Sequence, residues 1–112
     1  YDRYTVGKEK LQENGKLVTS EAIADCGGLS AAAEIAKGNP IILKDLYHNF
    51  AVIFASKYTS QILRFIIQMD PHPIGSARVN GALSSMPEFY QVYHITANDG
   101  MYVQPQQRVG IW

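Results

Sequence analysis

Two acidic side chains, Glu21 and Asp25, lie four residues apart in a stretch of mostly small residues. On a helix, residues with this spacing share one face, so both carboxylates would point the same way. A carboxylate on an apolar helix face needs a cation, a hydrogen-bond donor or water to compensate its charge. The pattern indicates that Glu21 is a candidate metal ligand and that Asp25 supports the metal site.

Both acids also have simpler interpretations. Glu21 would lie in the first turn of a helix, where the helix dipole favours a negative charge, and this alone would explain its presence. Asp25 could be a solvent-facing acid. The residues around the two acids, rather than the acids themselves, decide between these interpretations.

A second set of polar residues lies between positions 70 and 81. Asp70 precedes His72 by two residues, and Arg78 follows it by six. Pro71 and Pro73 flank the histidine and restrict where its imidazole can point, which suits a donor to a transition state. The simpler interpretation is an exposed loop histidine, with Arg78 in a surface ion pair that contributes little to stability.

The two segments together resemble the neprilysin and endothelin-converting-enzyme family of zinc metallopeptidases. Residues 21–28, Glu-Ala-Ile-Ala-Asp-Cys-Gly-Gly, are similar to that family's Glu-x-Ile-Ala-Asp-x-Gly-Gly segment. Residues 70–81 are similar to its Asp-x-His segment, in which an Arg follows the His by six residues and a Gly comes next. Residues 14–19, residues 86–89 and the final Trp112 extend the resemblance over most of the chain.

The resemblance implies a zinc-dependent metalloendopeptidase that hydrolyses oligopeptides with one zinc ion as cofactor. It assigns zinc binding to Glu21 and a hydrogen bond to a zinc-bound histidine to Asp25. It further implies that His72 stabilises the oxyanion of the tetrahedral intermediate and that Asp70 orients His72. Arg78 would bind a backbone carbonyl of the peptide substrate.

The His-Glu-x-x-His motif of such peptidases is absent from these 112 residues. The three histidines, His48, His72 and His94, are neither followed by Glu nor separated by three residues from one another. Catalytic zinc usually has three protein ligands. We therefore expect the remainder of the peptidase chain to supply two His ligands and the catalytic Glu, and this fragment alone to be inactive and not to bind zinc tightly. The alternative is a noncatalytic peptide-binding or scaffold domain derived from such a peptidase.

Net charge and cysteine content limit the possible partners and the source of the protein. The net charge is zero, so nothing favours nucleic acid as a partner. Cys26 is the single cysteine and cannot form an intrachain disulfide, which favours a bacterial member over the disulfide-rich animal ones. We expect its thiol to act as a small buried hydrophobe. The chain itself does not indicate localisation; by resemblance the protein would be secreted, periplasmic or associated with the cell envelope.

The predicted fold is mainly α, a single domain of three to four helices with irregular loops, which would form the C-terminal part of a zincin (thermolysin-like) catalytic domain. Residues 1–18 are expected to be an exposed approach segment, with at most short structure around residues 4–6, and residues 19–112 the helical body. Apolar surfaces normally covered by the rest of the peptidase would let the fragment self-associate.

Sequence patterns place the individual elements. Helices are expected from Thr19 or Ser20 to about residue 37, from 43 to 57, and from Thr59 or Ser60 to 70, where the proline at 71 ends the third. Residues 78–83 are expected to be extended, and a capping box over 85–88 opens a short helix to about 94. An apolar stripe on the second helix is assigned to the core (Leu46, Phe50, Ile53 and Phe54), and Gly27 and Gly28 indicate a close approach by another element.

Overall fold

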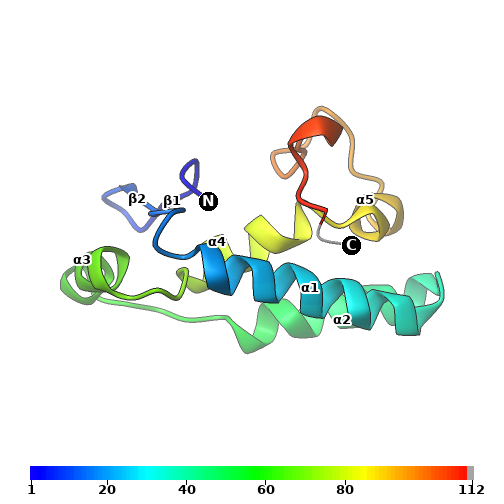
Figure 1. Ribbon diagram of the computed structural model, residues 1–112, viewed down its shortest axis with the longest axis horizontal. Helices are drawn as coiled ribbons and strands as arrows, with labels where there is room; N and C mark the ends of the chain where they lie inside the picture. The colour runs from blue at the N-terminus through cyan, green and yellow to red at the C-terminus, as the bar shows by residue number, and fades with distance from the viewer. Residues whose placement is uncertain (111–112) are drawn as a thin grey trace.

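The computed structural model describes residues 1–110, so the expectation about Trp112 lies outside the described residues. The predicted mainly helical class is confirmed (Figure 1). The described residues form five α-helices, one more than the upper expectation, together with a two-stranded antiparallel hairpin and a short 3-10 helix. In chain order these are β1 (Thr5–Val6), β2 (Leu11–Gln12), α1 (Thr19–Ala36), α2 (Pro40–Ile53), α3 (Ser60–Met69), α4 (Gly75–Leu83), α5 (Pro87–Val92) and η1 (Pro105–Gln107).

Helices α1 and α2 form a hairpin along the long axis of the molecule, and α4 packs against both. The turn between them is made by Lys37 and Gly38, whose φ angles are 48° and 76°. Asn39 then caps α2, because its Oδ1 accepts hydrogen bonds from the N–H groups of Ile41 and Ile42. The predicted end of the first helix, near residue 37, is confirmed. Helix α2 starts at Pro40 and not at residue 43 as expected.

The predicted caps have mixed outcomes. Thr59 caps α3 by accepting a hydrogen bond from the N–H of Ile62, as expected. The cap expected at Thr19 or Ser20 is wrong, because α1 starts after Val18 with no side-chain cap. The capping box expected before α5 is also absent, because Met86 occupies the N-cap position and no side chain caps the helix.

Residues 78–83 are helical, so the expectation of an extended segment is wrong. Three of them, Val79, Ala82 and Leu83, have the i, i+3, i+4 spacing of a helix face, and all three are buried. This face packs against α1 and α2. Tertiary packing therefore outweighs the low helix propensity of the Val-Asn-Gly sequence.

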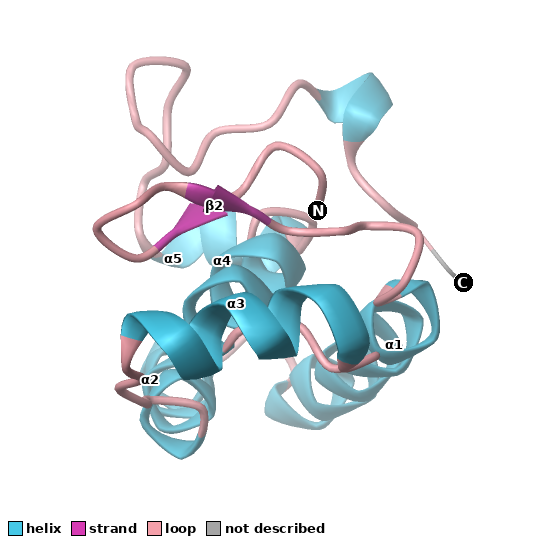
Figure 2. Cartoon of the chain, turned by 90° about the vertical axis from the view of Figure 1, so that its left-hand side faces the viewer, coloured by secondary structure: helices cyan, strands magenta, loops and turns pink. Residues whose placement is uncertain are grey.

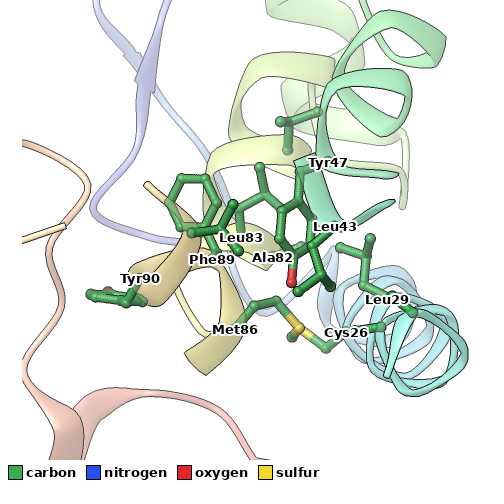
Figure 3. Packing of buried hydrophobic residues seen from close by; sticks show 13 residues of the cluster. Cys26, Leu29, Leu43, Tyr47, Ala82, Leu83, Met86, Phe89 and Tyr90 are labelled. Atoms are coloured by element: carbon green, nitrogen blue, oxygen red, sulfur yellow. The ribbon is translucent and has the colours of Figure 1, made fainter. Parts of the chain in front are cut away.

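Two hydrophobic clusters hold the fold together. The larger lies between α1, α2, α4 and α5 (Figure 3) and includes Cys26, Leu29, Leu43, Tyr47, Ala82, Leu83, Met86 and Phe89. The smaller one joins the β hairpin to α3 and α4 (Figure 2) and consists of Val6, Leu63, Ile74 and Ala77. Cys26 is buried and free, as expected.

The buried face of α2 differs from the predicted stripe. Leu43 and Tyr47 are its buried residues, whereas Leu46, Phe50 and Phe54 are only partly buried against the larger cluster. Ile53 is 74% exposed, so its assignment to the core is wrong. No helix within residues 1–110 is both long enough and apolar enough to cross a membrane.

The first 18 residues are more buried than expected. The hairpin fits the predicted short structure, but Val6, Glu13 and Val18 are 6%, 2% and 2% exposed. The segment therefore packs onto the helical body at these points and is not simply an exposed approach.

The two glycines Gly28 and Gly75 have opposite surroundings. A Cβ at Gly28 would have no atom within 4 Å, so the expected close approach is wrong there. A Cβ at Gly75 would lie 2.1 Å from the carbonyl oxygen of Phe54. The first residue of α4 therefore lies close to the carbonyl group of Phe54, the C-cap residue of α2.

We predict opposite effects of alanine at these two positions. Gly75→Ala should lower the free energy of unfolding by about 1–3 kcal/mol or more, because backbone must move to admit the methyl group. Gly28→Ala should raise it by about 0.5–1 kcal/mol, because it removes a glycine from an open helix position. Urea unfolding followed by circular dichroism measures both, and a Gly75→Ala midpoint equal to the wild-type value would contradict the packing described.

Candidate functional site

The structure brings the five predicted site residues into one cluster. Glu21 and Asp25 come from the first half of α1, and Arg78 comes from α4. Asp70 and His72 come from the loop that joins α3 to α4. Hydrogen bonds and close charge contacts connect all five side chains.

Arg78 is the centre of the cluster. Its Nε and Nη2 atoms donate hydrogen bonds of 2.6 and 2.7 Å to the two carboxylate oxygens of Asp25, and Nη2 also donates to Glu21 Oε2 at 3.1 Å. The side chains of Arg78 and Asp25 are only 14% and 8% exposed. Such paired, charge-assisted hydrogen bonds are among the stronger polar contacts in proteins. The hydrogen bonding with Asp25 raises the pKa of Arg78 above its usual value.

The guanidinium group of Arg78 also contacts an aromatic ring. Its central carbon lies 4.3 Å from the centroid of the Phe54 ring. A flat guanidinium stacks well on an aromatic face, and the contact limits the directions that the group can take. From its spacing Phe54 was expected only in the core stripe, because nothing in the sequence relates residue 54 to residue 78.

Asp70 holds His72 in one orientation. Asp70 Oδ1 lies 2.6 Å from His72 Nδ1 and accepts a hydrogen bond of 2.9 Å from the backbone N–H of the same histidine. These hydrogen bonds, the backbone one foremost, lower the pKa of Asp70 below its usual value. With Nδ1 engaged in this way, His72 Nε2 lies 3.8 Å from Glu21 Oε2. The imidazole therefore faces the carboxylate of the candidate metal ligand.

The described residues can supply one metal ligand but not a complete set. Within residues 1–110, no three His, Cys, Asp or Glu side chains come together as a metal-binding group. Both oxygens of Asp25 are engaged by Arg78. Glu21, at 32% side-chain exposure, is more accessible than Asp25 at 8%. The chemistry of this donor set fits zinc binding through Glu21 with further ligands from elsewhere.

The assigned roles of the five residues remain predictions, and the contact between Arg78 and Asp25 was not among them. An ion pair of Arg78 was expected only as the simpler alternative, and at the surface. Glu13, which is buried and accepts a hydrogen bond from the Ile74 N–H in the loop of His72, was not predicted either, because the sequence does not distinguish it from the other acids of its polar segment.

The ion cluster predicts a large stability difference between two arginine variants. Arg78→Met should lower the free energy of unfolding by about 3–5 kcal/mol, because it leaves the buried Asp25 carboxylate without its partner. Arg64→Met is the matched control, because Arg64 pairs with Glu9 at the surface, with side chains 58% and 38% exposed. That variant should change stability by about 0–1 kcal/mol. If chemical unfolding gave the same loss of unfolding free energy for both variants, the buried pairing of Arg78 with Asp25 would not be the stabilising contact described here.

Comparison with known proteins places the chain in a family. The sequence profile of peptidase family M13 matches residues 1–109. The chain is 33% identical over 112 residues to a neutral endopeptidase of Lactobacillus helveticus, covering 100% of this chain and 17% of that protein. It is 35% identical over 100 residues to a neutral endopeptidase of Lactococcus lactis subsp. lactis, covering 88% of this chain and 16% of that protein.

More distant relatives are animal proteins. Human neprilysin is 27% identical over 113 residues, covering 88% of this chain and 15% of that protein. The chain thus spans 15–17% of the length of these curated relatives. No solved structure gave a significant match. Because the family profile covers nearly the whole sequence, the chain belongs to peptidase family M13, the family that the neprilysin-like segments predicted.

Proposed function

We propose that this chain forms part of the active site of a zinc-dependent metalloendopeptidase that cleaves oligopeptides. The observation that carries the proposal is the convergence of Glu21, Asp25, Asp70, His72 and Arg78, from two separate segments of the chain, in one cluster. Family membership supports the same activity, because the relatives named above are a neprilysin and neutral endopeptidases.

Glu21 would hold the zinc ion, which when bound polarises the scissile carbonyl and activates a water molecule. Each oxygen of Asp25 accepts one hydrogen bond from Arg78 and has a second lone pair. Asp25 can therefore also accept an N–H from a histidine ligand and fix its tautomer, as carboxylates near zinc commonly do. Two histidine ligands and the general-base glutamate would come from sequence outside these 112 residues.

His72 and Arg78 would act on the substrate. With Nδ1 hydrogen-bonded to Asp70, a doubly protonated His72 ring can donate from Nε2 to the oxyanion that forms during peptide hydrolysis. The hydrogen bonds of Arg78 to Asp25 and Glu21 use Nε and Nη2. Nη1 carries two further N–H donors, which suit a backbone carbonyl of the peptide.

The outer faces of α2 and α3 support the proposal that the remainder of the peptidase packs against this chain. Four large apolar side chains there are strongly exposed: Ile41 at 72%, Ile53 at 74%, Phe65 at 66% and Met69 at 65%. Large apolar side chains exposed at several places on these two helices fit surfaces that another part of the protein covers. In the isolated chain the same residues would favour self-association.

The proposal predicts how the full-length protein responds to two histidine changes. His72→Ala should lower kcat for a peptide substrate by about 100- to 1,000-fold with a smaller effect on KM, because the lost donor acts mainly in the transition state. His48→Ala is the matched control, because His48 lies on α2 outside the cluster of site residues, and the change should leave both constants nearly unchanged. Removal of zinc by a chelator should abolish hydrolysis, and added zinc should restore it.

Three results would contradict the proposal. Zinc-independent hydrolysis would exclude the proposed cofactor, and an unchanged kcat in His72→Ala would exclude the oxyanion role. Peptide binding without any hydrolysis by the zinc-loaded full-length protein would favour the alternative, a noncatalytic peptide-binding domain.

A further inference from the structure

The loop that carries His72 contains few backbone donors. Pro71 and Pro73 have no N–H group, so residues 71–74 offer only the amides of His72 and Ile74. The amide of His72 donates to the neighbouring Asp70. The amide of Ile74 donates to Glu13 Oε1 at 3.3 Å, across 61 residues of sequence. Through the Ile74 N–H, Glu13 therefore connects this loop to a distant part of the chain.

Glu13 is itself firmly placed. It is 2% exposed, and its own N–H donates a hydrogen bond of 2.9 Å to the carbonyl oxygen of Tyr4. The second carboxyl oxygen, Oε2, is buried and has no hydrogen-bond partner among the described residues. Burial raises the pKa of Glu13, although the hydrogen bond from Ile74 and the amino group of Tyr1 oppose the effect. The peptidase proposal gives no role to this buried acid.

Ile74 connects Glu13 to both substrate-binding candidates. It is two residues from His72 and is the N-cap residue of α4. No side chain caps this helix. The carbonyl oxygen of Ile74 accepts a hydrogen bond of 2.8 Å from the N–H of Arg78. A negative carboxylate at the start of α4 is also favoured by the helix dipole. Displacement of the Ile74 amide would therefore shift the loop that carries His72.

We propose that Glu13 is a positioning residue of the site: its carboxyl group holds the Ile74 amide and thereby fixes the loop so that His72 faces Glu21. The inference rests on the proposed peptidase function, because its effect is exerted through His72. Glu13 does not touch the reacting atoms in this account. Its contribution is the orientation of the donor.

Three substitutions in the full-length protein distinguish the role of Glu13 as a hydrogen-bond acceptor from the role of its negative charge. Glu13→Gln keeps an acceptor oxygen at the same reach and should retain kcat within about threefold. Glu13→Asp keeps the charge but withdraws the acceptor by one methylene, and Glu13→Leu removes it. Both should lower kcat by about 10- to 100-fold, with KM changed less, as for other groups that orient active-site residues. Glu9→Leu is the control, because Glu9 lies on the same hairpin and pairs with Arg64.

A double-mutant cycle tests whether Glu13 acts through His72. In a His72→Ala background, Glu13→Asp should lower kcat by less than about threefold further, because the group that it positions is already absent. An equal factor in both backgrounds would overturn the inference, and so would Glu13→Asp and Glu13→Leu enzymes as active as Glu9→Leu. A wild-type protein without zinc-dependent hydrolysis would instead contradict the proposed function. The two failures are therefore distinguishable.

Stability as a function of pH gives a readout that is independent of activity. Because the folded state raises the pKa of Glu13, the ionised carboxylate destabilises the fold at neutral pH, and protonation removes this effect as pH falls. Glu13→Gln should unfold at a higher urea concentration than wild type at pH 7, and the difference should disappear below about pH 4, where the acid is protonated in both states. A difference that does not depend on pH would contradict the burial of an ionisable Glu13.

Discussion

The contact of Arg78 with Asp25 and Glu21 is the interaction on which the site depends. It joins α4 to the acidic face of α1, and it does so where the Arg78 and Asp25 side chains are 14% and 8% exposed. A buried carboxylate without a partner is strongly unfavourable, so this face of α1 cannot turn away from α4 without a large loss of stability. The apolar contacts of Cys26 and Ala82 in the adjoining cluster follow from the same apposition.

A second constraint places His72 relative to that ion cluster. The loop between α3 and α4 is stiffened by two prolines, is held at one end by Asp70, and leads into Gly75, where α4 meets the carbonyl of Phe54. These contacts place the loop backbone and direct Nδ1 of the imidazole toward Asp70. The geometry can therefore present a histidine donor toward Glu21 without a ligand to order it.

The sequence predicted the residues of the site better than it predicted the contacts among them. The resemblance of residues 21–28 and 70–81 to two segments of the peptidase family selected five residues that the structure brings together, which the spacing of the acids alone would not have done. The pairing of Arg78 with Asp25 could not be predicted in the same way, because it depends on how α1 packs against α4.

Local sequence signals predicted the helix ends that neighbouring residues determine. They did not predict the elements and contacts that depend on tertiary packing. Thr59 and Pro71 set the ends of α3 as predicted, because capping and the proline ring act on neighbouring residues. Helix α4 was missed because its Val-Asn-Gly sequence has low helix propensity and its burial supplies the stability. Glu13 was missed for a related reason: only the folded hairpin places it under the His72 loop.

In the proposed function, Glu21 is a zinc ligand in a site supported by Asp25 and Arg78. Anomalous diffraction at the zinc absorption edge, from crystals of the zinc-loaded full-length protein, tests it most directly. We expect one zinc ion with a Glu21 carboxylate oxygen at about 2.0–2.2 Å and Asp25 hydrogen-bonded to a histidine ligand while still paired with Arg78. A zinc ion bound without contact to Glu21, or no zinc in the cluster, would contradict it.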